Sequence, residues 1–311
     1  MASDNKKRTA KIARDEAVIA QLDRALFAWR AHLPRSAWKV VNESIRAVPS
    51  DVIGDFVDKY QRAGRDWGFM PKSILAAEVM TAVFRHLVKG RLHIHGVRNV
   101  NLAFSALGEG RIQHLYLLCN HVSYADASLV RMALGPMLSR FGFEDDFTVV
   151  VGPKVFRHAC RKFASLHFNT VQVAQSRIRA TPSVALPLSE IAKAARKAIH
   201  DICHHARLVL IFPEGGRSRS GKLMPFLPGV WRLLSAKASA GILPLSIEGS
   251  DRILPVGAAC LKRGCVTVRV GPMRELAEFS DGTDGMEAMA RSVASLMPPA
   301  KRGRYAPESL P

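Results

Sequence analysis

The chain has 311 residues, of which 48% are hydrophobic and 23% are charged, so it can form one large domain or two smaller ones. Its 45 basic and 26 acidic residues give a net charge of +19, which favours anionic partners such as nucleic acid, anionic lipid or an acidic carrier protein. The five cysteines form no CxxC pair, which disfavours a disulfide framework. The polar, basic start of the chain predicts no secretory signal, and no charge-free stretch is long enough to cross a bilayer.

Residues 1–90 are predicted to form a helical region. An apolar stripe runs from Ile19 to Leu33, a second begins at Trp38, and Ser50 and Ser73 are expected to cap two further helices. The first stripe has two interpretations, because it could pack against neighbouring helices or lie on a membrane surface, helped by the preceding Lys and Arg residues.

After Gly90 the pattern changes to short runs rich in Val, Ile and Leu. The predicted strands are Leu92–His95, Leu115–Cys119, Phe147–Val151, Thr170–Val173, Leu208–Phe212, Ile242–Ile247 and Val266–Val270. Predicted helices separate several of them, namely Ala127–Phe141, Leu188–His205 and Val230–Ser239. This alternation predicts an α/β domain over residues 91–297, with a mixed, largely parallel sheet covered by helices on both faces, and a tail over 298–311. Ligands of such sheets lie beyond the carboxyl ends of the strands.

A first group of chemically capable residues follows the predicted strand Leu115–Cys119. The segment reads Asn120-His121-Val122-Ser123-Tyr124-Ala125-Asp126 and leads into a helix that Ser123 is expected to cap. If the turn folds Asp126 against His121, the carboxylate would orient the imidazole as a general base. A structural histidine beside a helix cap is an equal alternative on spacing alone. The chain has no GxSxG motif, so the base would act directly on a substrate hydroxyl.

A second group follows the predicted strand Leu208–Phe212. It reads Pro213-Glu214-Gly215-Gly216-Arg217-Ser218-Arg219-Ser220-Gly221-Lys222, in which glycines allow close approach of an anion and basic side chains suit phosphate. A solvated basic turn is the alternative. The segment Gly216–Lys222 also matches GxxxxGK, but Leu223 stands where a nucleotide-binding loop needs Ser or Thr, so we interpret this match as coincidence.

Together these segments resemble the lysophospholipid (glycerolipid) acyltransferase superfamily. His121 and Asp126 match its HxxxxD motif, and Phe212–Ser218 resembles its FPEGTRS motif. The segment Ile242–Ile247, with its central proline, is similar to the family's later apolar block, and the resemblance covers about Leu92 to Val270.

The resemblance implies roles for individual residues. His121 would be the general base and Asp126 its orienting partner, while the acceptor's glycerol and phosphate would be lined by Glu214, Gly215, Gly216, Arg217 and Ser218. The family's further basic acceptor site is matched best by Arg177 and Arg179, with Lys154 as another candidate, although a solvated role for the two arginines is also open. The segment from Phe147 to Ser189 contains no acidic residue, which favours a surface that faces an anion.

The resemblance also implies a reaction and a location. An acyl group would pass from acyl-CoA or acyl carrier protein to a hydroxyl of lysophosphatidic acid in phospholipid biosynthesis, with no metal or other cofactor. We expect a cytoplasmic protein, peripheral on the inner face of the membrane.

Two further functions remain open. Gly216, where the motif usually has Thr, resembles glycerol-3-phosphate acyltransferases, whereas Leu243–Gly249 resembles lysophosphatidate acyltransferases, so glycerol 3-phosphate is an alternative acceptor. A non-catalytic protein that binds anionic lipid or nucleic acid is the alternative of another class. Because the chain lacks C2H2 and RNP1 motifs, we expect no nucleic-acid partner.

Overall fold

The computed structural model describes residue 30 and residues 33–46, 49–65, 67–174, 187–235, 239–258 and 260–306. Of the predicted stripe from Ile19 to Leu33, only Arg30 and Leu33 fall in these ranges, and Leu33 is buried. Arg177 and Arg179 lie outside the described residues.

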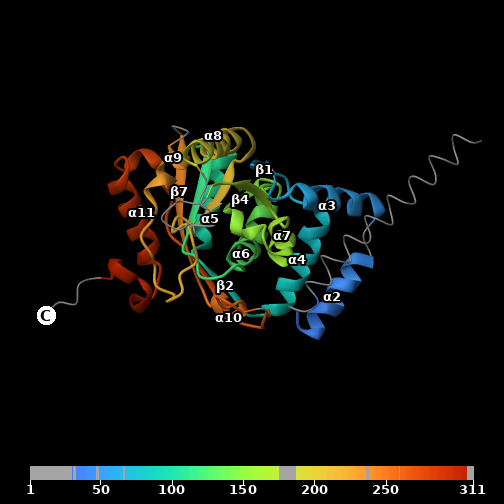
Figure 1. The fold of residues 1–311 in the computed structure, drawn as a ribbon. Coiled ribbons are helices and arrows are strands. Elements are labelled where there is room, and N and C mark those ends of the chain that lie inside the picture. The colour runs from blue at the N-terminus through green and yellow to red at the C-terminus, as the bar shows by residue number, and fades with distance from the viewer. Residues whose placement is uncertain are drawn as a thin grey trace, which may run out of the picture.

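A mixed sheet forms the centre of the described part of the chain (Figure 1). Its strands are β1 (Gly68–Met70), β2 (Leu92–His95), β3 (His114–Cys119), β4 (Phe147–Val151), β5 (Asn169–Gln172), β6 (Leu208–Ile211), β7 (Ala240–Glu248), β8 (Val266–Val270) and β9 (Arg274–Glu275). They lie in the order β1-β5-β4-β6-β3-β7-β8-β2, with β9 beside β7. The five strands from β5 to β7 in this order are mutually parallel, which confirms the predicted largely parallel sheet. Their carboxyl ends therefore share one edge.

Helices cover both faces of this sheet. They are α2 (Arg35–Arg46), α3 (Ser50–Arg62), α4 (Ile74–Leu87), α5 (Val97–Gly108), α6 (Asp126–Phe141), α7 (Ala159–Ser165), α8 (Leu188–His205), α9 (Trp231–Leu234), α10 (Ser250–Ile253) and α11 (Thr283–Ser295). Short 3₁₀ turns are η1 (Pro153–Val155), η3 (Pro228–Val230), η4 (Leu276–Glu278), η5 (Pro299–Lys301) and η6 (Gly303–Tyr305). In Figure 1, α11 lies on the left of the sheet and α2, α3 and α4 lie on the right.

Strand β3 shows how the sequence produces two hydrophobic layers. Successive side chains of a strand point to opposite faces. Leu115, Leu117 and Cys119 accordingly join the core formed with α4, α5 and α6. Tyr116 and Leu118 join the core formed with α8 and α11. Because both faces of β3 are covered, the strand reads as an uninterrupted apolar run.

The structure differs from the prediction in several elements. Of the helix predicted over Val230–Ser239, the structure shows the short α9 preceded by η3, and residues 236–238 lie outside the described residues. The N-terminal region contributes a strand, β1, which pairs antiparallel with β5. Gly68 starts this strand with φ at 100°, a conformation that does not continue a helix. The helices α5 and α11 were not predicted.

The expected helix caps are only partly correct. Pro49, and not Ser50, occupies the N-cap position of α3. Ser73 is at the N-cap of α4, but its buried hydroxyl makes no capping hydrogen bond.

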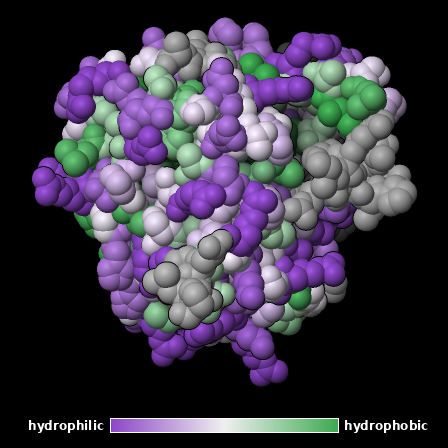
Figure 2. Space-filling view, turned by 90° about the vertical axis from the view of Figure 1, so that its left-hand side faces the viewer, coloured by the Kyte–Doolittle hydropathy of each residue, from purple (hydrophilic) through white to green (hydrophobic). Residues whose placement is uncertain are grey.

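Residues 298–306 of the segment predicted as a tail pack against the rest of the domain. Tyr305 is buried, and the Leu223 amide donates to the carbonyl oxygen of Lys301 at 2.8 Å. The domain boundaries at residues 90 and 297 stay predictions. The first region contributes the strand β1 to the sheet of the second. Among the described helices, none is both long and apolar enough to span a bilayer. The face drawn in Figure 2 is largely hydrophilic, with its hydrophobic residues in small groups.

Candidate active site

The loop after β3 brings His121 and Asp126 together. Asp126 is the first residue of α6 and is completely buried, and its Oδ2 lies 2.8 Å from Nδ1 of His121. The same oxygen accepts the backbone N–H groups of Val122 and Ser123 at 2.8 and 2.9 Å. The expected fold of Asp126 onto His121 is therefore confirmed. Because a carboxylate only accepts hydrogen bonds, it assigns the proton to Nδ1 and leaves the lone pair on Nε2.

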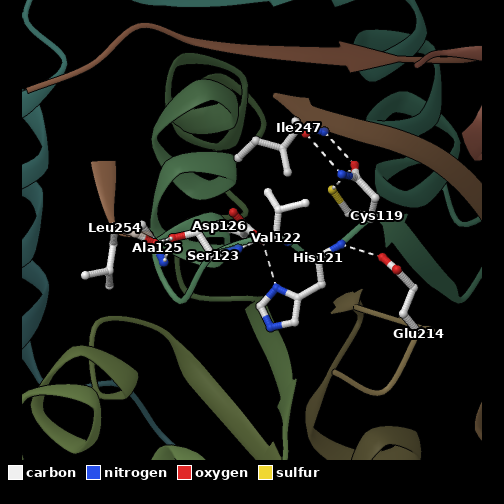
Figure 3. A network of polar contacts seen from close by, with 10 residues as sticks. Cys119, His121, Val122, Ser123, Ala125, Asp126, Glu214, Ile247 and Leu254 are labelled. Atoms are coloured by element: carbon white, nitrogen blue, oxygen red, sulfur yellow. Dashed lines mark hydrogen bonds and ion pairs between the residues drawn. The ribbon is translucent and has the colours of Figure 1, made fainter. Parts of the chain in front are cut away.

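The imidazole of His121 packs against an aromatic ring and is partly exposed to solvent. Its ring stacks on Phe212, with centroids 4.2 Å apart and an interplanar angle of 23°. The side chain of His121 remains 15% exposed. Figure 3 shows the ring pointing away from the polar network, with its second nitrogen directed away from Asp126. This arrangement gives a fixed tautomer and a partly exposed imidazole whose Nε2 points away from Asp126, as a general base requires.

Ser123 does not cap α6, so that prediction is wrong. The N-cap residue is Ala125, whose backbone N–H donates to the Ser123 hydroxyl at 3.1 Å. The hydroxyl itself donates to the carbonyl oxygen of Leu254, just after α10, at 2.9 Å. The backbone N–H groups of Val122 and Ser123 donate to Asp126 and not to a capping serine. The Ser123 hydroxyl links this loop to the residue after α10.

Asn120 joins the end of β3 to β7. Its side-chain amide donates to the carbonyl oxygen of Ile247 at 3.1 Å, and its side-chain oxygen accepts the Ile247 N–H at 2.8 Å. The side chain thus continues the pairing of the two strands beyond Cys119, where the backbones separate. Asn120 fixes the position from which His121 projects, a role that the sequence analysis did not assign.

Glu214 links the two predicted groups of residues. The side chain is completely buried, and its Oε1 accepts the backbone N–H of His121 at 2.6 Å while Oε2 accepts that of Met224 at 2.9 Å. The Ser218 amide in turn donates to the carbonyl oxygen of His121 at 2.7 Å. The two strand ends therefore converge. Each Glu214 oxygen is already occupied by a backbone amide, and its contact with an acceptor stays a prediction.

The glycines of the turn after β6 have different structural needs. Gly215 is exposed and has φ at 66°, the left-handed region that favours glycine. At Gly216 an added Cβ would meet nothing within 4 Å, so the backbone does not require glycine there. Ser218 is buried, with its hydroxyl 3.3 Å from that of Ser220.

Arg217 is held on the ring of Tyr124. Its guanidinium carbon lies 3.6 Å from the ring centroid. Burial lowers the pKa of Arg217, the charge of Arg161 lowers it further, and Tyr124 acts in the opposite direction. Arg161, on α7, donates from Nη1 to the Tyr124 hydroxyl at 2.6 Å and lies 4.6 Å from the same ring centroid. Arg161 belongs to no motif that the sequence reveals, and its one sequence signal is its place in the acid-free segment from Phe147 to Ser189.

Lys154 lies in η1, directly after β4. The strands β4, β6 and β3 are parallel neighbours, so this lysine is at the same edge of the sheet as His121 and Arg217. The second predicted basic position, at Arg177 and Arg179, lies outside the described residues. Within the described ranges, no group of three or more His, Cys, Asp or Glu side chains could hold a metal ion.

Comparison with protein-family models assigns the chain to one family. Residues 91–248 match the model of the family described as Acyltransferase. A segment of 61 residues is 38% identical to a chloroplastic 1-acyl-sn-glycerol-3-phosphate acyltransferase of Brassica napus, which corresponds to 19% of this chain and 17% of that relative. The crystal structure of the 1-acyl-sn-glycerophosphate (LPA) acyltransferase PlsC from Thermotoga maritima is 16% identical, with a TM-score of 0.45 over 82% of this chain and 85% of that chain.

Proposed function

Because the chain belongs to the Acyltransferase family, we propose that it transfers a fatty acyl group from a thioester to a hydroxyl of lysophosphatidic acid. The observation that carries this proposal is the convergence of His121, oriented by Asp126, with the turn that contains Arg217. Both groups lie inside the matched region. The short segment that is 38% identical to a 1-acyl-sn-glycerol-3-phosphate acyltransferase supports the choice of acceptor.

The chemistry follows from the accessible Nε2 of His121. This nitrogen takes the proton of the acceptor hydroxyl while the hydroxyl oxygen attacks the thioester carbonyl carbon. Asp126 stabilises the positive charge that forms on the imidazole, because its Oδ2 accepts the Nδ1 proton at 2.8 Å. When the tetrahedral intermediate collapses, the carbon–sulfur bond breaks and the imidazolium returns the proton to the leaving thiolate. The products are an ester and a free thiol, and no covalent acyl-enzyme forms.

The donor is acyl-CoA or acyl carrier protein. Both carry negative charge, and the net charge of +19 attracts them over a longer distance than any single contact. A lipid acceptor also requires the protein to work at a membrane surface, so we propose a peripheral association at the cytoplasmic face.

Glycerol 3-phosphate is a second candidate acceptor. The observation that favours it is Gly216, which stands where the family motif usually has threonine although the backbone would accept a side chain there. The absence of that side chain leaves room beside Arg217 for an acceptor with a different shape around its glycerol.

An acceptor assay tests the proposed function. The purified full chain is mixed with acyl-CoA or acyl carrier protein, and either lysophosphatidic acid or glycerol 3-phosphate is added. We expect thiol release to depend on the acceptor, with the higher kcat/KM for lysophosphatidic acid. A higher kcat/KM for glycerol 3-phosphate would make glycerol 3-phosphate the acceptor in place of lysophosphatidic acid. A protein that binds these anions but releases no thiol with either would contradict the enzymatic function and favour a lipid-binding role.

A further inference from the structure

Tyr124 gathers two arginines from distant parts of the chain beside His121. Arg217 comes from the turn after β6, whereas Arg161 comes from α7. We infer that Arg161, together with Arg217 and Tyr124, forms a two-arginine cradle for a phosphomonoester dianion and is a specificity-determining residue for the acceptor. The identity of the acceptor rests on the proposed function, whereas the cradle itself rests on the geometry.

The charges of the cradle are unbalanced. Both guanidinium groups lie against one aromatic ring, at 3.6 and 4.6 Å from its centroid, and both arginines are partly buried. Among the described residues, no carboxylate forms an ion pair with either of them. Burial lowers the pKa of Arg217 and the charge of Arg161 lowers it further, whereas Tyr124 and Asp126 act in the opposite direction. Two partly desolvated cations beside the same ring are stabilised when an anion binds to both of them.

The hydrogen-bond donors of the cradle match a phosphate. The Tyr124 hydroxyl oxygen accepts from Nη1 of Arg161, which leaves the phenolic hydrogen available to donate. The remaining N–H groups of two guanidinium groups and one hydroxyl can therefore donate to a ligand that has only acceptors. A phosphomonoester has three terminal oxygens and a charge of about −1.5 to −2 at neutral pH, whereas a phosphodiester carries a single charge. The cradle thus favours a monoester acceptor over lysophospholipids whose phosphate carries a further head group.

The position of the cradle fits the reaction at His121. The rings of His121 and Tyr124 are 6.4 Å apart, a separation that a glycerol backbone between phosphate and reacting hydroxyl can span. Arg161 is also firmly placed, because its neighbours Cys160 and Phe163 are buried and Phe163 packs on Phe56 with ring centroids 5.1 Å apart. A preformed cradle restricts the orientation of the acceptor before the proton transfer begins.

The test compares Arg161→Ala with Arg157→Ala, which removes the same charge from an exposed side chain four positions earlier in the chain. Arg161→Lys is added as a variant that keeps the charge without the guanidinium fork. For each full-length protein, kcat and KM are measured with lysophosphatidic acid and with monoacylglycerol, which lacks the phosphate. Calorimetric titration with a short-chain lysophosphatidic acid measures binding directly, and thermal unfolding checks the fold.

We expect Arg161→Ala to raise KM and Kd for lysophosphatidic acid by about tenfold to a hundredfold, as for loss of a charge-assisted hydrogen bond. The kcat and the KM for the thioester should stay unchanged, and Arg161→Lys should recover part of the affinity. With monoacylglycerol, Arg161→Ala and the wild type should have the same kcat/KM. Arg157→Ala should behave as the wild type throughout.

Two results would overturn the inference. One is a folded Arg161→Ala protein that binds lysophosphatidic acid as tightly as the wild type. The other is an increase of KM for the thioester alone, which would assign the arginine to the donor. If the wild type binds lysophosphatidic acid but transfers no acyl group, the proposed function fails, whereas weaker binding by Arg161→Ala would still support the cradle.

Discussion

Glu214 links the loop after β3 to the turn after β6, and Glu214→Gln replaces one of its two carboxylate oxygens by an NH₂ group. The two Glu214 oxygens accept the backbone amides of His121 and Met224 at 2.6 and 2.9 Å. Glutamine has one oxygen, so its NH₂ group must face one of these amides and donor then meets donor. Because the side chain is completely buried, water does not replace the lost acceptor.

The expected loss of stability follows from these contacts. One hydrogen bond to a charged acceptor disappears, at about 1.5–3 kcal/mol, and the other becomes a neutral bond of about 0.5–1.5 kcal/mol. The free energy of unfolding should therefore fall by about 2.5–4.5 kcal/mol, which corresponds to a decrease of Tm by about 4–7 °C in a chain of this size. Turnover should fall as well, because either orientation of the glutamine weakens the hydrogen bond to the His121 amide.

Differential scanning calorimetry and the acceptor assay measure the two effects. Glu190→Gln, at an exposed position in the first turn of α8, is the matched control and should melt near the wild type. If Glu214→Gln melts at the wild-type temperature and keeps the wild-type kcat, the two loops do not depend on this carboxylate and the reasoning fails.

Two further predictions concern buried groups. In Asp126→Asn the side-chain oxygen can still accept the Nδ1 proton of His121, but the negative charge is lost. In steady-state kinetics, kcat should therefore fall about tenfold while KM for the acceptor stays unchanged. An unaltered kcat would exclude a role for the charge. His167 is completely buried, and this burial holds its pKa well below 6.5, so the unfolded chain takes up a proton that the folded chain does not. The free energy of unfolding should therefore decrease by about 1.4 kcal/mol per pH unit as the pH falls below about 6.5, and His167→Gln should reduce this slope in urea denaturation. Equal slopes for both proteins would contradict the assignment.

Much of the fold could be predicted because the central strands are buried on both faces. Such strands, including β3 and β4, appear in the sequence as continuous apolar runs. The helix α11 was missed because its buried face consists mainly of Met, Ala and Gly residues, which form a weak apolar pattern. The three-residue strand β1 is held by its pairing with β5, a contact that no local pattern reveals.

The candidate site could be predicted where the signal was local. His121 and Asp126 are five positions apart on one loop, so turn geometry alone was sufficient to bring them together. The link through Glu214 joins residues 93 positions apart, and the contact of Arg161 with Tyr124 spans 37 positions. Such contacts depend on strand order and on where α7 packs, which the sequence pattern did not specify.

The central claim is that His121 removes the proton of the acceptor hydroxyl. The most direct test is kcat of His121→Ala with saturating thioester and lysophosphatidic acid, in a protein whose thermal unfolding matches the wild type. We predict that kcat decreases at least about 100-fold, the usual contribution of a general base, while lysophosphatidic acid still binds. A folded His121→Ala protein with near-wild-type turnover would contradict the account.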